Sequence, residues 1–375
     1  MPRTTLSLNS FVSGEFSAKM DGRVDFEKYS SGTKTLQNFL VHPQGAATRR
    51  VGTQFIAEVK NSAKKVRLIP FEFSTTQTYI LEFGDQYMRV YKDKGQVLSG
   101  GSPFEISTPF LEAELFDIKF AQSADVMYLC HPNHDVRKLS RTGHTAWTLA
   151  TVSFTGSPSL PISGANNRPS CVSFFEQRLV FANTITNPQT LWFSKAGDYE
   201  NFTTGTNADD AMIYTIASNQ VNAIQYLKAV RTLVVGTSGG EFTVSADGTD
   251  ASITPTNVTI KRQSSFGSAG VDAIPAGNAV LFLQKAKRKI RELTYNFDSD
   301  GYVAPDLTIL NDTVTKSGVN QMIFQQEPDS IIWCVRDDGV LAGLTYQRSE
   351  NVVAWHRHIF GGVFGSGDAV CESVA

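Results

Sequence analysis

The segment 236–240 contains a serine in a pattern that could support nucleophilic chemistry. It reads Gly-Thr-Ser-Gly-Gly, which matches the G-x-S-x-G string of a nucleophile elbow. An elbow needs a strand before the serine and a helix after it, and a histidine and an acid must activate the hydroxyl. Residues 241–245 are instead typical of a second strand, and the sequence identifies no such partners for Ser238. We therefore interpret this segment as a hairpin turn.

The segment 296–301 contains oxygen-bearing residues at the spacing of a calcium loop. It reads Asn-Phe-Asp-Ser-Asp-Gly, with side-chain oxygens at alternate positions and a glycine for the sharp turn. The second half of the motif fails, because Leu307 occupies the position of the bidentate glutamate. Asn, Asp and Gly also favour turns for local reasons. We therefore predict an Asx-rich turn.

Two pairs of histidines could each offer two imidazole ligands to a metal. His131 and His134 flank a Pro-Asn turn, and His356 and His358 are expected to alternate between the faces of a strand. Two ligands do not complete a metal site, and no cysteine or further histidine lies at a fitting spacing. The sequence therefore predicts neither a metal site nor a cofactor.

The segment 285–291 carries five positive charges in seven residues on a predicted hairpin. Such a run is either a solvated turn or a contact for nucleic-acid phosphates or an acidic partner surface. No aromatic residues are interleaved with it, so stacking on single-stranded bases is not expected. We assign it to docking on an acidic neighbouring protein, with these residues in the docking turn: Lys285, Lys287, Arg288, Lys289 and Arg291.

Composition excludes several classes of protein. The 375 residues carry a net charge of −2, 19% are charged and 41% are hydrophobic, which disfavours intrinsic disorder and a generally basic nucleic-acid binder. Apolar runs do not exceed five residues, so no membrane helix is predicted. The first residues lack the apolar core of a signal peptide, and the four widely spaced cysteines are expected to be buried, inert thiols.

Strand-like segments recur with a period near 50 residues beyond residue 50. Six apolar strands, each followed by a turn and a second strand, begin at residues 79, 126, 179, 233, 280 and 331. One four-stranded propeller blade requires about this length. A β-sandwich is the alternative, but sandwich strands alternate polar and apolar residues, whereas the first strand of each unit here is apolar on both faces and is interpreted as an inner blade strand.

The predicted fold class is therefore all-β, a six-bladed β-propeller with an N-terminal platform or interface segment. We expect residues 1–50 to form that segment, 51–364 the propeller and 365–375 a C-terminal tail. The best helix candidate is 32–40, where Leu36, Phe39 and Leu40 share one helical face.

Stretches spread over nearly the whole chain resemble one family, the tail nozzle proteins of short-tailed bacteriophages, also called tail tubular protein B or stabilisation proteins. The similar N-terminal stretches are 13–17 (Ser-Gly-Glu-Phe-Ser), 22–25 (Gly-Arg-Val-Asp), Tyr29, Asn38-Phe39 and 45–53 (Gly-Ala-Ala-Thr-Arg-Arg-Val-Gly-Thr). The later ones are 71–73 with 79–84, 178–182 with 194–202, 236–242, 325–329 and 337–341 through Trp355.

The resemblance implies a propeller on a platform domain, assembled as a homohexameric ring below the portal and the head-tail adaptor. It implies a channel through which double-stranded DNA passes without sequence specificity, tail fibres or spikes as further partners, and a location in the virion tail after assembly in the host cytoplasm. Family members are usually longer, so the tail 365–375 is also interpreted as the possible start of a missing segment.

The expected function is structural, with no catalysis. Arg49 and Arg50 either lie in an exposed loop or anchor a neighbouring chain, and we expect them, with Arg23 and Asp25, to form charge-assisted pairs between subunits. The alternative function is a sialidase-like or glycan-binding propeller, which would need an arginine cluster and Asp-box turns. Residues 194–202 only approximate such a turn, because Ala196 occupies the Asp position.

Overall fold

The computed structural model describes residues 8–156, 162–217, 220–248, 251–365 and 367–375, and strands dominate them. Their helices are short 3₁₀ turns: η1 (Ala18–Met20), η2 (Glu27–Ser31), η3 (Glu112–Asp117) and η4 (Arg348–Glu350). None of the helices in these ranges is long and apolar enough to cross a membrane. The predicted all-β class is confirmed.

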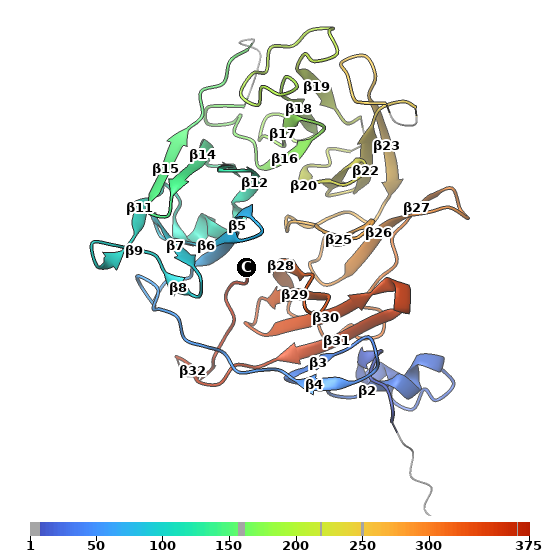
Figure 1. Cartoon of the computed structure of the whole chain (residues 1–375). Coiled ribbons are helices and arrows are strands. Elements are labelled where there is room, and N and C mark those ends of the chain that lie inside the picture. The colour runs from blue at the N-terminus through green and yellow to red at the C-terminus, as the bar shows by residue number, and fades with distance from the viewer. Residues whose placement is uncertain (1–7, 157–161, 218–219, 249–250, 366) are drawn as a thin grey trace, which may run out of the picture. The chain divides into compact units, whose positions relative to one another are not determined.

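Six sheets of four or more strands follow one another along the chain, each wound back and forth as a propeller blade is (Figure 1). The first contains β5 (Arg67–Ser74), β6 (Gln77–Gly84), β7 (Tyr87–Lys92), β8 (Gly95–Gln96) and β11 (Glu105–Ser107). The second contains β12 (Lys119–Ser123), β13 (Val126–His131), β14 (His134–Gly143) and β15 (Ala146–Thr151). The third contains β16 (Cys171–Phe175), β17 (Arg178–Ala182), β18 (Thr190–Phe193) and β19 (Met212–Thr215).

The remaining three sheets repeat this connectivity. The fourth contains β20 (Ile224–Ala229), β21 (Leu233–Thr237), β22 (Gly240–Ser245) and β23 (Thr259–Ser264), and the fifth β24 (Ile274–Ala276), β25 (Ala279–Leu283), β26 (Ile290–Asn296) and β27 (Gly301–Val303). The sixth contains β28 (Val319–Gln325), β29 (Ile331–Arg336), β30 (Leu341–Gln347) and β31 (Val352–His358). Short pairs are β9 (Leu98–Ser99) with β10 (Ser102–Pro103), and β32 (Val363–Phe364) with β33 (Gly367–Asp368).

The six predicted repeat units coincide with the second and third strands of the six sheets. The apolar strand of each unit is therefore a second strand of a blade, such as β17, β21 or β25, and not the first strand that begins each sheet. All five residues of each of these three strands are buried. A second strand has a bonded strand on both edges and a neighbouring sheet on its faces, so both of its faces become apolar.

The chain divides into two compact units. One consists of residues 55–285, 293–304 and 375, and the other of residues 1–54, 286–292 and 305–374. This division does not separate the chain at residues 50 and 364, and it does not test the domain boundaries predicted there, which stay predictions.

In the larger unit the apolar core lies between consecutive sheets. One cluster joins the first and second sheets, where Phe71 packs edge-on against Trp147 with ring centroids 4.8 Å apart. Further clusters join the second sheet to the third and the third to the fourth. A sandwich has a single core between two sheets, whereas a propeller has one core layer for each pair of blades. This arrangement is that of β-propeller blades.

In the smaller unit the N-terminal segment extends the sixth sheet. Strand β1 (Gly14–Glu15) pairs in parallel with β31, and β2 (Gly32–Thr33) pairs with β1. The helix predicted for residues 32–40 is wrong. Residues 39–41 form strand β3 (Phe39–Val41), which pairs with β4 (Ala47–Arg49), because Leu36 and Val41 pack on Val352 and Ala354 while Phe39 is exposed.

The C-terminal tail is held against the sixth sheet. The backbone N–H of Cys371 donates to the carbonyl of Gly339 at 2.7 Å, and the side-chain amide of Gln321 donates to the carbonyl of Val374 at 2.7 Å. Gly339 has φ +77°, and a Cβ there would lie 2.4 Å from Cβ of Val370, so the close approach of the tail requires glycine. All four cysteines are free. Cys130, Cys171 and Cys334 are buried as predicted, whereas Cys371 is half-buried, and burial raises the pKa of each thiol.

Candidate functional site

The N-terminal segment joins the sixth sheet through an unusually close backbone approach. Gly14, at φ +66°, pairs with Trp355 of β31. A Cβ at position 14 would lie 2.4 Å from the backbone nitrogen of Trp355, so the residue must be glycine. The Ser-Gly-Glu-Phe-Ser stretch therefore has a structural reason for its glycine.

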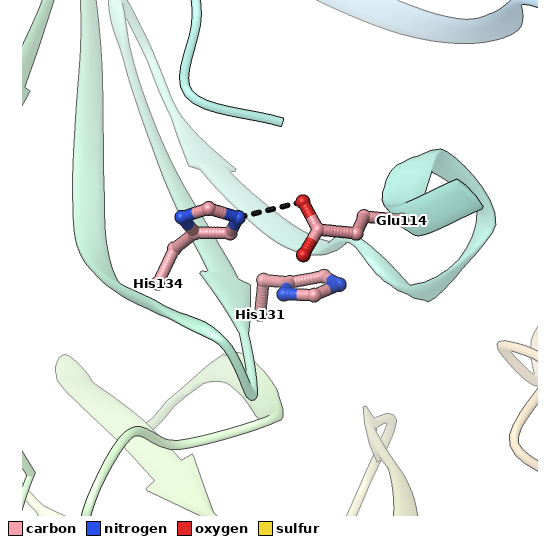
Figure 2. Close-up of side chains that lie close together, drawn as sticks. All are labelled: Glu114, His131 and His134. Atoms are coloured by element: carbon pink, nitrogen blue, oxygen red, sulfur yellow. Dashed lines mark hydrogen bonds and ion pairs between the residues drawn. The ribbon is translucent and has the colours of Figure 1, made fainter. Parts of the chain in front are cut away.

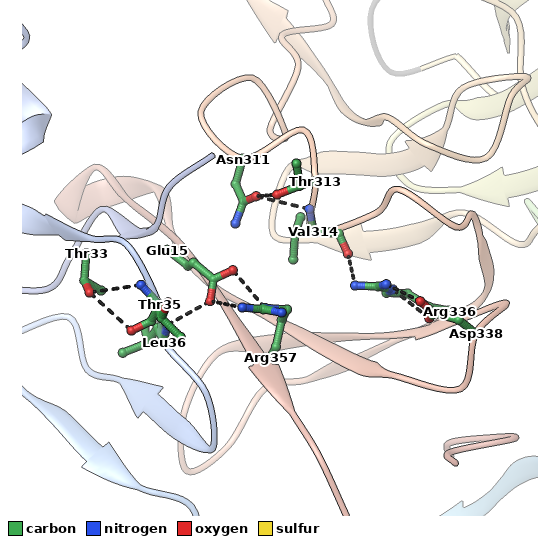
Figure 3. A network of polar contacts seen from close by, with 10 residues as sticks. All are labelled: Glu15, Thr33, Thr35, Leu36, Asn311, Thr313, Val314, Arg336, Asp338 and Arg357. Atoms are coloured by element: carbon green, nitrogen blue, oxygen red, sulfur yellow. Dashed lines mark hydrogen bonds and ion pairs between the residues drawn. The ribbon is translucent and has the colours of Figure 1, made fainter. Parts of the chain in front are cut away.

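A buried carboxylate fixes the same segment from the next position. Glu15 is 4% exposed, and it forms an ion pair with Arg357 (Figure 3). Its Oε2 accepts a hydrogen bond from Nη2 of Arg357 at 3.0 Å, and its Oε1 lies 2.8 Å from Nε. The backbone N–H of Leu36 donates to the same carboxylate at 2.8 Å. The Glu15 carboxylate thus contacts both strand β31, through Arg357, and a later part of the N-terminal segment, through Leu36. We call Glu15, Leu36 and Arg357 the N-terminal clamp.

The hairpin β3–β4 is bound to the sixth sheet as well. The hydroxyl of Thr345 donates to the carbonyl of Val41 at 2.9 Å, and the backbone N–H of Asn38 donates to the carbonyl of Arg357 at 2.7 Å. The side chain of Asn38 accepts from the N–H of Ile359 at 2.9 Å. Together with the N-terminal clamp, these contacts bind the segment that carries Arg49 and Arg50 to the sixth sheet.

Two of the predicted interface residues pair with each other. Arg23 and Asp25 form a two-pronged ion pair, with both nitrogen–oxygen distances at 2.8 Å. Their side chains are 53% and 64% exposed. The hydrogen bond from Arg23 lowers the pKa of Asp25 below its ordinary value. The pair lies at the surface, and whether it contacts another subunit stays a prediction.

The other two predicted interface residues differ from each other. Arg49 is exposed at the end of β4, whereas the guanidinium of Arg50 lies 5.1 Å from the ring centroid of Phe360 and donates to the carbonyl of Ile359 at 3.5 Å. Arg50 thus has an intrachain role. Arg49 offers its charge to solvent and, in our prediction, to a neighbouring chain.

Two cations of the predicted docking turn make contacts within their own chain. Lys289 forms an ion pair with Asp306 at 3.1 Å, and Lys287, at φ +58°, donates to the side chain of Asn320 at 3.2 Å. Lys285 and Arg288 are exposed, and Arg291 is half-buried. The docking role of this turn stays a prediction.

The two turns predicted instead of active or metal sites are confirmed. Thr237 and Gly240 pair across a hairpin that contains Ser238, and a strand, not a helix, follows. In the other segment the N–H of Ser299 donates to the side chain of Asn296 at 3.0 Å, so the asparagine bonds to the backbone of its own turn three residues on.

One histidine pair departs from the expected geometry. His356 and His358 are two residues apart on β31 and therefore lie on the same face, with Nδ1 of His356 2.7 Å from Nε2 of His358. The expectation that they alternate between faces is wrong, because the side-chain period of a strand is two. Burial lowers the pKa of His356 to about 3 and of His358 to about 4, so both rings are neutral at pH 7.

Sequence reasoning missed the third member of the other histidine cluster. Glu114 in η3 lies beside His131 and His134, and one potential ligand atom from each residue lies within 4.8 Å of the others. No sequence signal indicates this acid, since it is separated from the histidines by strands β12 and β13.

Comparisons with known proteins give no family. No protein-family model matches the chain, and no curated protein matches it. Similar solved structures include a protein from Lactobacillus plantarum, with 13% identity, TM-score 0.45 and coverage of 78% of this chain and 82% of that one. Another is the WD40 domain of Neurospora crassa Pan2, with 7% identity, TM-score 0.45 and 82% coverage of both chains.

A third similar structure is the β-propeller domain of Cps50 (Swd1) from Myceliophteria thermophila. It is 10% identical, with a TM-score of 0.44 and coverage of 77% of this chain and 85% of that one. These low values carry no conclusion about function.

Proposed function

We propose that the protein is a structural subunit of the tail nozzle ring of a short-tailed bacteriophage. In this role six copies form a passive conduit for double-stranded DNA below the adaptor, and their outer surface holds tail fibres or spikes. The observation that carries the proposal is the N-terminal clamp. It fixes the family-like stretch 13–53 to a sheet and leaves the charges of Arg23, Asp25 and Arg49 exposed.

A rigid N-terminal segment suits ring formation. Head-to-tail contacts close a ring only when each copy presents its two different surfaces at a fixed angle. The clamp and the β3–β4 hairpin supply such a fixed presentation within one chain. Arg49 can then make a two-pronged contact with a carboxylate of the next subunit.

Weak interaction with DNA suits a conduit. Each phosphate that a protein neutralises adds salt-dependent affinity, which would retard a moving genome. The net charge is −2, and two of the five cations of the docking turn already bind Asp306 and Asn320. We assign the remaining exposed cations, Lys285 and Arg288, to an acidic protein neighbour.

The absence of catalysis is part of the proposal. A sialidase-like site needs several arginines converging on a substrate carboxylate. Arg178 is 2% exposed and donates to the backbone carbonyls of Ser194, Asp210 and Ala208 at 2.6 to 2.7 Å. Arg336 and Arg141 bind Asp338 and Asp125. These arginines support their own loops.

Native mass spectrometry tests the proposed assembly. We expect a hexamer, and we expect Arg49→Ala to weaken it while Lys94→Ala, an exposed cation of the first sheet, leaves it intact. Hexamers that are equally stable in both variants would refute the interface assignment. A monomer at all concentrations would refute self-assembly of the isolated chain.

A further inference from the structure

The turn between β13 and β14 and the 3₁₀ helix η3 bring together three side chains with metal-binding atoms. His131 ends β13, His134 begins β14, and Glu114 extends from η3 toward both rings (Figure 2). The two imidazole centroids are 5.2 Å apart. Chain segments separated by about 20 residues thus converge on one small volume.

The carboxylate of Glu114 is held in place by three donors. The N–H of Leu111 donates to Oε2 at 3.0 Å, the side-chain amide of Asn133 donates to Oε1 at 2.9 Å, and Nε2 of His134 lies 2.7 Å from Oε2. Burial acts to raise the pKa of Glu114, but these hydrogen bonds outweigh it and lower the pKa to about 2. The group is therefore an anion at neutral pH, in a fixed orientation.

The buried ring of His131 has an atom without a partner. The ring is 2% exposed, and burial lowers its pKa, so it is neutral. Its Nδ1 accepts from the N–H of Asn133 at 3.1 Å, while Nε2 is buried and has no hydrogen-bond partner within the part of the chain that the structure describes. Leaving a buried polar group unpaired costs about 1–3 kcal/mol.

We propose that Glu114, His131 and His134 bind a divalent transition-metal ion, Zn²⁺, which ties η3 to the β13–β14 turn. Two imidazole nitrogens and one carboxylate oxygen form a donor set that Zn²⁺ accepts in tetrahedral geometry, with water in the fourth position. Nε2 of His131, which otherwise has no partner among the described residues, then coordinates the ion, and the negative charge of the Glu114 carboxylate offsets part of the charge of the ion. The proposal is independent of the nozzle role.

Binding requires small movements of two groups. The 2.7 Å contact between His134 and Glu114 must widen, because ligand atoms about 2.0–2.2 Å from a zinc ion lie farther apart than hydrogen-bonded atoms. The proton that Nε2 of His134 donates to Glu114 must move to Nδ1, because a zinc-bound nitrogen carries no proton. For His131 to bind through Nε2, its ring proton must move to Nδ1, so the contact with the N–H of Asn133 must open. His134 is 20% exposed and Glu114 is 14% exposed, so solvent can deliver the ion.

The second histidine pair shows what the proposal depends on. His356 and His358 are as close as a metal site requires, but they hydrogen-bond each other, and the contacts around them come from Thr345 and Trp333. Neither of these residues offers a carboxylate. What distinguishes the Glu114 cluster from this pair is its carboxylate. If that carboxylate is required, replacing Glu114 by an uncharged residue should weaken zinc binding even though both histidines remain.

Calorimetric titration of ZnCl₂ into the untagged, chelator-stripped full chain tests the site. We expect one Zn²⁺ per chain, and at least tenfold weaker binding in Glu114→Gln and in His134→Ala. His42→Ala is the matched control, because His42 also contacts a carboxylate, Asp329 at 3.1 Å, and should leave binding unchanged. Circular dichroism checks that each variant is folded.

Two further measurements make the result decisive. Co²⁺ bound to the unmodified chain should show the intense visible absorption of tetrahedral coordination. This measurement does not depend on the folding of any variant. Mg²⁺ should not compete, because it prefers all-oxygen ligands. Failure to bind Zn²⁺, or equal affinity in Glu114→Gln, His134→Ala and His42→Ala, would overturn the proposal and leave a hydrogen-bonded cluster without an ion.

Discussion

The N-terminal segment and the docking turn are both rich in charge, but they use it in opposite ways. In the N-terminal segment a buried acid, Glu15, binds Arg357 and fixes the backbone, and Arg49 is left exposed. In the docking turn the cations themselves make the fixing contacts, through Lys287 and Lys289. In this molecule a charged side chain stays available to a partner where other residues make the contacts that fix the backbone around it.

We expect the largest loss of stability from Glu15→Ala. It removes the acceptor of the Leu36 N–H and leaves Arg357 unpaired, which should cost about 3 kcal/mol of unfolding free energy in urea denaturation. Glu15→Gln keeps an oxygen for the N–H and should recover part of the loss. If both variants unfold with the free energy of the unmodified chain, the clamp does not fix the segment.

Gly14→Ala should have the next largest effect. The new Cβ would overlap the backbone of Trp355 at a position with φ +66°, so we expect a loss of about 1–3 kcal/mol. Gly22→Ala is the control, because it also has positive φ but no neighbouring atom within 4 Å. Thermal unfolding should show a clearly larger shift for position 14. Equal shifts would mean that backbone conformation alone, and not the approach to β31, sets the cost.

The docking turn should show a smaller, pH-dependent effect. Burial acts to raise the pKa of Asp306, but hydrogen bonds from Thr308 and Lys289 lower it below 3.8. A lowered folded-state pKa gives stability that is present above the unfolded value and lost as the pH falls through the folded value. Lys289→Ala should therefore cost up to about 1 kcal/mol at pH 7, a difference that disappears in acid. A cost that is constant from pH 7 to pH 2 would contradict this role.

Arg49→Ala should have the smallest effect on folding, within about 0.5 kcal/mol, because the side chain is exposed. Arg50→Ala should cost slightly more, about 0.5–1 kcal/mol, through the lost contact with Phe360. Denaturation of the two variants in parallel separates these roles. A large loss for Arg49→Ala would show that it supports the fold and is not free for a partner.

Local pattern predicted the strands but not the contacts between distant segments. The apolar runs at β17, β21 and β25 and the turn at Ser238 were readable, because strand period and turn chemistry act over a few residues. The pairing of Glu15 with Arg357 was not, since 342 positions separate them. Glu114 was missed although it lies only 20 positions from His134, because strands β12 and β13 intervene and their packing sets the contact. The error at His356 and His358 was different, because the strand period itself places them together.

Electron microscopy of the purified full chain and of labelled virions tests the central claim most directly. We predict six-fold rings with an open channel, and antibody label at the end of a short tail. Monomeric particles together with label absent from the tail would contradict the nozzle assignment.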